Sequence, residues 1–151
     1  MDGCMDQLPK ELFTVENMSI RDGWGMTPIH KAIEFELFHR IPSWVVTVES
    51  MLVKDNEGLT PLHDAAIYGV LNCIPKSLLT TEYLLMENNE GTSALHFAAA
   101  NSHLDQVPLG LKLPESVREL VGEDWWARNQ AVLCDKELLS AEEEGVEVEI
   151  F

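Results

Sequence analysis

Long hydrophobic runs are missing from this 151-residue chain. No segment approaches the roughly 18 consecutive apolar residues that a membrane-spanning helix needs. The amino terminus also lacks the basic region and following hydrophobic stretch that mark a secretory signal peptide. We therefore expect a soluble protein that stays in the compartment where it is made.

Cysteine is scarce as well. The chain has three, Cys4, Cys73 and Cys134, which is an odd number at unrelated spacings. That pattern fits neither a disulfide framework nor a zinc site. The simplest interpretation is a reducing, cytoplasmic environment.

Basic residues are few: 26 acidic residues face 10 basic ones, which gives a formal net charge of −16. This charge disfavours a phosphate backbone or an anionic membrane as a binding partner, because both need Lys and Arg to neutralise them. It favours partners with a basic surface.

Catalytic motifs are absent too: there is no Gly-rich phosphate loop, His-Glu-x-x-His pair, nucleophile elbow or Cys-x-x-Cys. Two acidic pairs could in principle act as paired carboxylates, namely Glu34 with Glu36 and Asp55 with Glu57. In so acidic a chain such pairs arise by composition, and we expect them on a solvated surface. The sequence predicts a protein that is not an enzyme and needs no cofactor or metal.

What the chain does contain is one pattern in several copies. X-Pro dipeptides recur every 33 residues, at Leu8-Pro9, Ile41-Pro42, Ile74-Pro75 and Val107-Pro108, and histidines keep the same interval at His30, His63 and His96. A period shared by several residue types is typical of an array of one supersecondary unit, whose apolar face is too small to bury alone. The function should therefore lie on an extended surface rather than in a closed pocket.

Each copy contains signals for two helical segments. Thr60 can cap a helix and Pro61 fits its first position, and apolar residues follow at 62, 65 and 66 on one narrow stripe. Residues 74–79, behind Pro75, predict a short return helix, and Thr80 or Thr81 with Glu82 predicts a further turn. The runs 22–25, 55–58 and 88–91 predict projecting turns, because Asn, Asp and Gly tolerate positive φ.

Three segments, 27–33, 60–66 and 93–99, repeat the pattern Thr-Pro-Leu-His-x-Ala-Ala with small changes. This pattern resembles the signature of ankyrin repeats, whose 33-residue period the chain also has. The resemblance spans residues 7–130 and implies an all-α solenoid of stacked helix-turn-helix units with projecting turns. The departures are Ile33 for Ala, Ala94 for Pro, Glu36 and Ser102 at the turn position held by Gly69, and an unusual second helix with an early Pro.

The repeat phase sets the expected domain organisation. Residues 1–140 form a single ankyrin-repeat domain, with an N-terminal half repeat at 1–21, full repeats at 22–54, 55–87 and 88–120, and a degenerate C-terminal cap at 121–140. We expect Trp125 and Trp126 in the cap to cover the last apolar edge, because Trp is costly to leave exposed.

The regular histidines are not expected to bind a metal. Stacked helices lie about 8–10 Å apart, too far for equivalent residues to share one small ion. We expect the rings of His30, His63 and His96 to bond the Thr or Ser hydroxyl and the backbone of the adjacent turn, as the resemblance also implies. His39 and His103 fall outside the repeat and are expected on the surface.

The resemblance implies a partner-binding concave face, made by the projecting turns and the first helix of each copy. Positions on this face that differ between copies are free to specialise. They are Trp24, Met26, Lys31, Phe35, Glu57, Leu59, Asp64, Tyr68, Glu90, Thr92, Phe97 and Asn101. They combine aromatic residues with acidic neighbours. For Phe35 and Tyr68 the alternative is packing against the next copy.

The main hypothesis is a non-catalytic adaptor or inhibitor, monomeric on its own, that binds a protein partner with a basic surface through this face. The alternative is an acidic decoy that occupies the nucleic-acid-binding groove of a nuclease or defence protein. A third possibility is that the array is only part of a larger assembly. Direct binding to nucleic acid or membrane is not expected.

The acidic tail, residues 141–151, leaves two further alternatives open. Seven acids lie in the last seventeen residues, where only Lys136 opposes them. They form either a solvated tail or a competitor for a basic surface. The alternation of Val146, Val148 and Ile150 is compatible with a strand that adds to a partner's sheet, although such a terminus is more often frayed or packed on its own domain.

Overall fold

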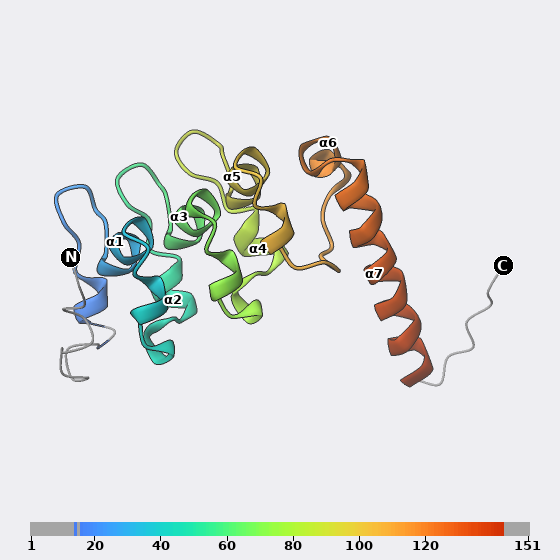
Figure 1. The fold of residues 1–151 in the computed structure, drawn as a ribbon, viewed down its shortest axis with the longest axis horizontal. Coiled ribbons are helices and arrows are strands. Elements are labelled where there is room, and N and C mark those ends of the chain that lie inside the picture. The colour runs from blue at the N-terminus through green and yellow to red at the C-terminus, as the bar shows by residue number, and fades with distance from the viewer. Residues whose placement is uncertain (1–13, 15, 144–151) are drawn as a thin grey trace. The chain divides into compact units, whose positions relative to one another are not determined.

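The computed structural model describes Thr14 and residues 16–143 (Figure 1). These residues are helical and form no β-strand, which confirms the all-α prediction. They fall into two compact units that divide between Val107 and Pro108. The repeat bounds remain a proposal. The first X-Pro dipeptide and the alternating valines of the tail lie outside the described residues.

In the first unit, longer helices alternate with single helical turns. The longer helices are α1 (Pro28–Glu34), α3 (Pro61–Tyr68) and α5 (Ala94–Ala100), and the single turns are α2 (Val48–Met51) and α4 (Thr81–Leu84). Helix α3 packs between α1 and α5, and the loops that precede these three helices project together from one side of the row (Figure 1). This is the stack of repeated units that the 33-residue period predicts.

The longer helices begin where the sequence predicts. Thr27, Thr60 and Ser93 are the N-cap residues, and Pro28 and Pro61 occupy the first helical position. The Thr60 hydroxyl accepts a hydrogen bond from the backbone N–H of His63 at 3.4 Å. These caps satisfy N–H groups that have no partner within the helix.

The predicted apolar stripe forms the core of the stack. Leu62, Ala65 and Ala66 of α3 are buried, and the equivalent residues Leu95 and Ala98 of α5 are buried as well. Alanines at the contact allow the helices to approach closely, so each copy covers the apolar side of the next.

The short return helix predicted behind Pro75 is present only as a single 3-10 turn. The segment around Pro75 forms two 3-10 turns, η6 (Leu71–Cys73) and η7 (Lys76–Leu78), and the chain is extended between them, with φ −91° and ψ 138° at Ile74. Proline explains the interruption, because Pro75 lacks an N–H and disfavours the α conformation at the preceding residue. The further turn is confirmed: Thr80 caps α4 and accepts from the backbone N–H of Tyr83 at 3.3 Å.

An Asp or Asn side chain braces each projecting turn. The Asp55 carboxylate accepts from the backbone N–H groups of Glu57 and Leu59, both at 2.9 Å, and Asp22 and Asn88 do the same in the neighbouring copies. Positive φ falls on the glycines of these turns, such as Gly58 with φ +80°. Aspartate and asparagine therefore serve as hydrogen-bond acceptors, while glycine supplies the left-handed backbone.

Neighbouring turns are joined by a ladder of asparagines with the 33-residue spacing. The Asn56 N–H donates to the Trp24 carbonyl at 3.0 Å, and the Asn89 N–H donates to the Glu57 carbonyl at 3.0 Å. The ladder leaves no room for side chains at Gly25 and Gly58, because a Cβ on Gly58 would lie 2.5 Å from Asn89 Oδ1. The projecting turns therefore hold one another in register.

Backbone strain is also present just after α1 and α5, at the position where the chain has Gly69 after α3. Glu36 and Ser102, which stand at the position of Gly69, adopt φ values of 59° and 61°. Non-glycine residues rarely enter this region. The turn geometry is therefore the same in all three copies, although only one has the residue that suits it.

The second unit contains 3-10 turn η9 (Glu115–Val117), single turn α6 (Arg118–Val121) and long helix α7 (Glu123–Glu143). Trp125 and Trp126 of α7 are buried. Asn129, at the repeat position of His96, is fully buried and accepts from the N–H groups of Gly110 and Leu111 at 2.8 and 2.9 Å. Its amide N–H donates to the Leu111 carbonyl at 2.8 Å, so Asn129 holds the segment that follows Val107.

The turn ladder predicts different costs for the same substitution at equivalent glycines. Gly58→Ala is disfavoured both by the positive φ and by the clash of the added Cβ with Asn89. Gly91→Ala is disfavoured only by its φ of +77°, because no atom lies within 4 Å of the added Cβ. We expect Gly91→Ala to lower the free energy of unfolding by about 1–2 kcal/mol and Gly58→Ala by about 1 kcal/mol more. Urea denaturation measures both, and equal losses would refute a role for the ladder.

Asn129→Ala should destabilise the protein by about 1–3 kcal/mol, because two N–H groups and a carbonyl lose their partner. Thermal or urea unfolding tests this expectation. Gln130→Ala, an exposed neighbour on the same helix, is the control and should change stability little. A loss no larger than that of the control would contradict the bracing role of Asn129.

Candidate functional site

The three regular histidines are structural, as predicted. His30 Nδ1 accepts from the backbone N–H of Thr27 at 3.0 Å and lies 2.8 Å from its hydroxyl oxygen. The ring proton is therefore on Nε2, which donates to the Leu59 carbonyl of the next copy at 3.1 Å. His63 and His96 make the same Nδ1 contacts with their own caps.

Burial lowers the pKa of both His30 and His63, because the imidazolium form is desolvated. The Leu59 carbonyl and, for His63, the backbone of Met86 and Thr92 oppose this shift only in part. The neutral tautomer that the caps need is thus also the form that burial favours.

The expectation for His103 is wrong. Its ring is half-buried, and Nδ1 lies 2.8 Å from the Ala66 carbonyl at the end of α3. A Cβ on Gly69 would lie 2.7 Å from His103 Nε2, so the glycine makes room for the ring. Carbonyls at a helix end lack partners within the helix, and His103 supplies one from the next copy. His39 is exposed, as predicted.

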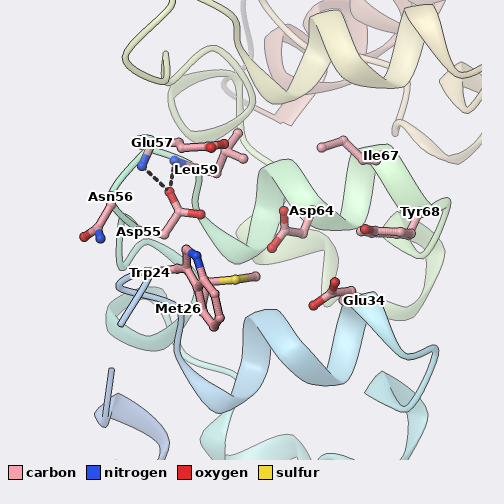
Figure 2. A pocket seen from close by; sticks show the side chains of 10 residues that line it. All are labelled: Trp24, Met26, Glu34, Asp55, Asn56, Glu57, Leu59, Asp64, Ile67 and Tyr68. Atoms are coloured by element: carbon pink, nitrogen blue, oxygen red, sulfur yellow. Dashed lines mark hydrogen bonds between the residues drawn. The ribbon is translucent and has the colours of Figure 1, made fainter. Parts of the chain in front are cut away.

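A concavity of the described surface lies between the first and second copies (Figure 2). We call it the acidic hollow; its volume is about 290 Å³. It is lined from the first copy by Trp24, Met26 and Glu34, from the second turn by Asp55, Asn56, Glu57 and Leu59, and from α3 by Asp64, Ile67 and Tyr68. Four of these residues are acids.

Asp64 is the most unusual residue of the acidic hollow. It is only 4% exposed, and its Oδ2 is buried without a hydrogen-bond partner. The pKa of Asp64 is raised to about 7, first by burial and then by the charges of Asp55 and Glu34, while Lys31 opposes the shift. A carboxyl group in this setting is only partly ionised at neutral pH.

Aromatic side chains stand at the rim of the acidic hollow. Trp24 is 71% exposed, and Tyr68 is also exposed. Lys31 Nζ lies 5.6 Å from the centroid of the Trp24 ring and 3.0 Å from a carboxylate oxygen of Glu34. The hollow thus combines a buried acid, further carboxylates and an aromatic face that already attracts one cation.

A second hollow, of about 410 Å³, lies between the second and third copies. Its lining includes Glu57, Leu59, Glu90 and Phe97, together with Ile67 and the turn asparagines 56, 88 and 89. The Phe97 ring meets the His63 ring edge-on, with centroids 6.0 Å apart. The Phe97 side chain is therefore half-buried: it packs against His63 and also lines the second hollow.

The structure distributes the predicted site residues unevenly. Six line the acidic hollow, namely Trp24, Met26, Glu57, Leu59, Asp64 and Tyr68, and Glu90 and Phe97 line the second hollow. Lys31 lies beside Trp24, whereas Phe35, Thr92 and Asn101 line neither hollow. Asn101 donates to the Phe97 carbonyl at 2.8 Å.

Four residues of the acidic hollow escaped the sequence prediction: Glu34, Asp55, Asn56 and Ile67. A signal for two of them was available. Glu34 follows Lys31 by three positions and Ile67 follows Asp64 by three, so each lies on the same helix face as a predicted residue. The sequence predicts Asn56 only as a turn residue, and Asp55 as a turn residue and as part of an acidic pair with Glu57 on a solvated surface.

Neither a metal centre nor a membrane helix is apparent in the described residues. No group of three or more His, Cys, Asp or Glu side chains there is arranged to hold a metal ion. Helices in this part of the chain are all too short or too polar to span a bilayer.

The raised pKa of Asp64 predicts an inverse dependence of stability on pH. The folded protein holds a proton on Asp64 that the unfolded chain releases between pH about 4 and 7, so the contribution of Asp64 to stability falls as pH rises through this window. Asp64→Asn should remove this loss and raise the free energy of unfolding at pH 8 by about 1–3 kcal/mol. At pH 4 the variant and wild type should differ little.

Urea denaturation at pH 4, 6 and 8 measures this difference. Asp105→Asn makes the same change at an exposed acid and should follow wild type at every pH. If the advantage of Asp64→Asn did not grow with pH, the assigned environment of Asp64 would be wrong.

Comparison with known families agrees with the stacked copies. Residues 36–109 match the family model described as ankyrin repeats in 3 copies. No curated protein gives a significant match. The matched segment contains α2 to α5, the Asn89 step of the turn ladder and most of the acidic hollow. This match agrees with the stack of capped helices, which repeats every 33 residues. The chain is an ankyrin-repeat protein.

Proposed function

We propose that this chain is a non-catalytic module that binds a partner protein through the face formed by its projecting turns and first helices. Ankyrin repeats are in general protein–protein interaction modules and are typically non-catalytic. The observation that carries the proposal is Trp24, which is 71% exposed at the rim of the acidic hollow. A large aromatic residue at such a rim suits a partner contact better than solvent.

The proposed binding surface comprises the twelve residues at which the copies differ. Its central part is the acidic hollow and the second hollow, which share Glu57 and Leu59. Phe35, 64% exposed at the end of α1, extends the aromatic part of this surface. Packing of Phe35 against the next copy, the alternative considered from sequence, is hard to reconcile with this exposure.

A basic partner suits this surface. The net charge of −16 creates a field that speeds encounter with positively charged proteins, and the carboxylates of the acidic hollow concentrate this charge beside Trp24. The adaptor or inhibitor role thus rests on aromatic contacts for affinity and on charge for selection.

We further propose a reducing, cytoplasmic setting and a monomer in the absence of the partner. Cys73 and Cys134 are free and exposed, which suits a compartment that keeps thiols reduced. The strong net charge opposes self-association.

The proposal predicts that two aromatic residues carry much of the binding energy. Affinity capture from the native host, with and without residues 141–151, supplies the partner. Trp24→Ala and Phe97→Ala should each weaken its binding by about 2 kcal/mol, or roughly thirtyfold, at moderate salt. Titration calorimetry or biolayer interferometry measures this loss.

Trp44→Ala is the matched control, because Trp44 is 53% exposed but lines neither hollow. It should leave binding unchanged. Insensitivity to Trp24→Ala and Phe97→Ala, together with a steep salt dependence and competition by DNA, would overturn the proposal in favour of an acidic decoy.

A further inference from the structure

The acidic hollow contains a carboxyl group whose position the stack of helices does not explain. Asp64 lies in the same helix as the buried Leu62, Ala65 and Ala66, yet its Oδ2 has neither a hydrogen-bond partner nor contact with solvent. Figure 2 shows this carboxyl pointing from α3 into the hollow, toward the space between Trp24 and Glu34. Buried polar groups are nearly always paired, so an unpaired one that faces a concavity points to a missing ligand.

The charges around Asp64 identify the sign of that ligand. Asp55, Glu34 and Glu57 all disfavour a further negative charge, and Lys31 is the one cation that acts on Asp64 in the opposite sense. A cation in the acidic hollow would relieve repulsion among these carboxylates and give Asp64 Oδ2 a partner. A neutral donor would give Asp64 Oδ2 a partner but would leave the repulsion in place, and an anion would increase it.

The shape and lining of the acidic hollow identify the kind of cation. Its volume of about 290 Å³ lies at the lower limit of pockets for drug-sized ligands and suits a single side chain. Metal-type clusters are absent from the described residues, and the rim offers aromatic rings in place of further ligands. Carboxylates beside an exposed indole match an organic cation with a flat face.

Arginine meets these requirements better than lysine does. Its guanidinium donates two parallel hydrogen bonds to a carboxylate and stacks on aromatic rings, and it is less strongly hydrated than an ammonium group. The contact of Lys31 with Trp24 at 5.6 Å indicates that the indole face is accessible to a cation. An incoming guanidinium could share or replace this contact.

We infer that the acidic hollow is a receptor for an arginine side chain of the partner protein, with Asp64 as the buried carboxylate that accepts its hydrogen bonds and Trp24 as the ring beside it. The inference rests on the proposed function and adds the chemical identity of the contact. It distinguishes Asp64, which binds the guanidinium, from the other acids, which favour its entry.

Arginine binding should be linked to a proton. Burial raises the pKa of Asp64 to about 7, so part of the population must lose a proton before the carboxylate can pair with a guanidinium. Affinity should therefore rise as pH increases from 6 to 8. The groups that act on Asp64 are Asp55, Glu34, Glu57, Lys31 and the phenol of Tyr68. Glu34 and Lys31 remain paired with each other, at 3.0 Å.

The test uses N-acetyl-arginine N-methylamide as the probe, with the intact chain labelled with ¹⁵N. The citrulline analogue has nearly the same shape without the charge, and the lysine analogue has the charge without the planar fork. Titration is followed at the indole N–H resonance of Trp24, with that of Trp44 as an internal control. The proteins are wild type, Asp64→Asn and the exposed-acid control Asp105→Asn.

We expect saturable shifts of the Trp24 resonance with the arginine probe in wild type and Asp105→Asn, and affinity at least about tenfold weaker in Asp64→Asn. The lysine probe should bind more weakly, and the citrulline probe should not bind. Affinity of the arginine probe for wild type should increase with pH, and this increase should be lost in Asp64→Asn. The variant loses no hydrogen bond of Oδ2, so it should fold.

Absence of a saturable shift, equal binding of the citrulline probe, or undiminished binding by Asp64→Asn would each overturn the inference. Lysine binding equal to that of arginine would overturn the choice of guanidinium. The captured partner separates this inference from the proposed function. A partner that needs Trp24 and Phe97 but is indifferent to Asp64→Asn would leave the binding face intact and refute the arginine receptor.

Discussion

The described stack depends on hydrogen bonds between each helix cap and its histidine, and in the first copy the histidine ring also reaches the next copy. In the first copy, His30 Nδ1 accepts from the Thr27 cap, and Nε2 donates to the Leu59 carbonyl of the next copy. One side chain thus fixes where a helix starts and how far away its neighbour lies. Since the neutral ring is needed for both contacts, burial reinforces the arrangement by lowering the pKa of His30.

The spacing of the helices in the core also sets the spacing of the projecting turns. The distance that the histidines and alanines set between copies also places each turn asparagine against the carbonyl of the preceding turn, as Asn56 does with Trp24. Hydrogen bonds between turns therefore support the part of the rim of the acidic hollow that consists of loop residues. A binding surface built this way loses little conformational entropy when a partner docks.

The acidic hollow illustrates how a repeat array gains an individual function. The capping and core positions agree between copies because the stack requires it, whereas Asp64 stands where the neighbouring copies have Lys31 and Phe97. At that position a carboxyl group costs stability, because it is buried among other acids. A cost of this kind, confined to one copy and open to a concavity, is typical of residues retained for binding.

Local sequence determined the repeating part of this protein. The 33-residue period, the Thr and Ser caps, and the short apolar stripe depend only on neighbours in the chain, so the helices at 28, 61 and 94 could be predicted from residue types. The return segment is limited to 3-10 turns because Pro75 disfavours the α conformation at Ile74. Only the stacked structure decided the burial of Asp64 and the placement of Trp24 and Tyr68 at one hollow. They arise between copies, where distances depend on how helices pack, and no pattern within one copy encodes that distance.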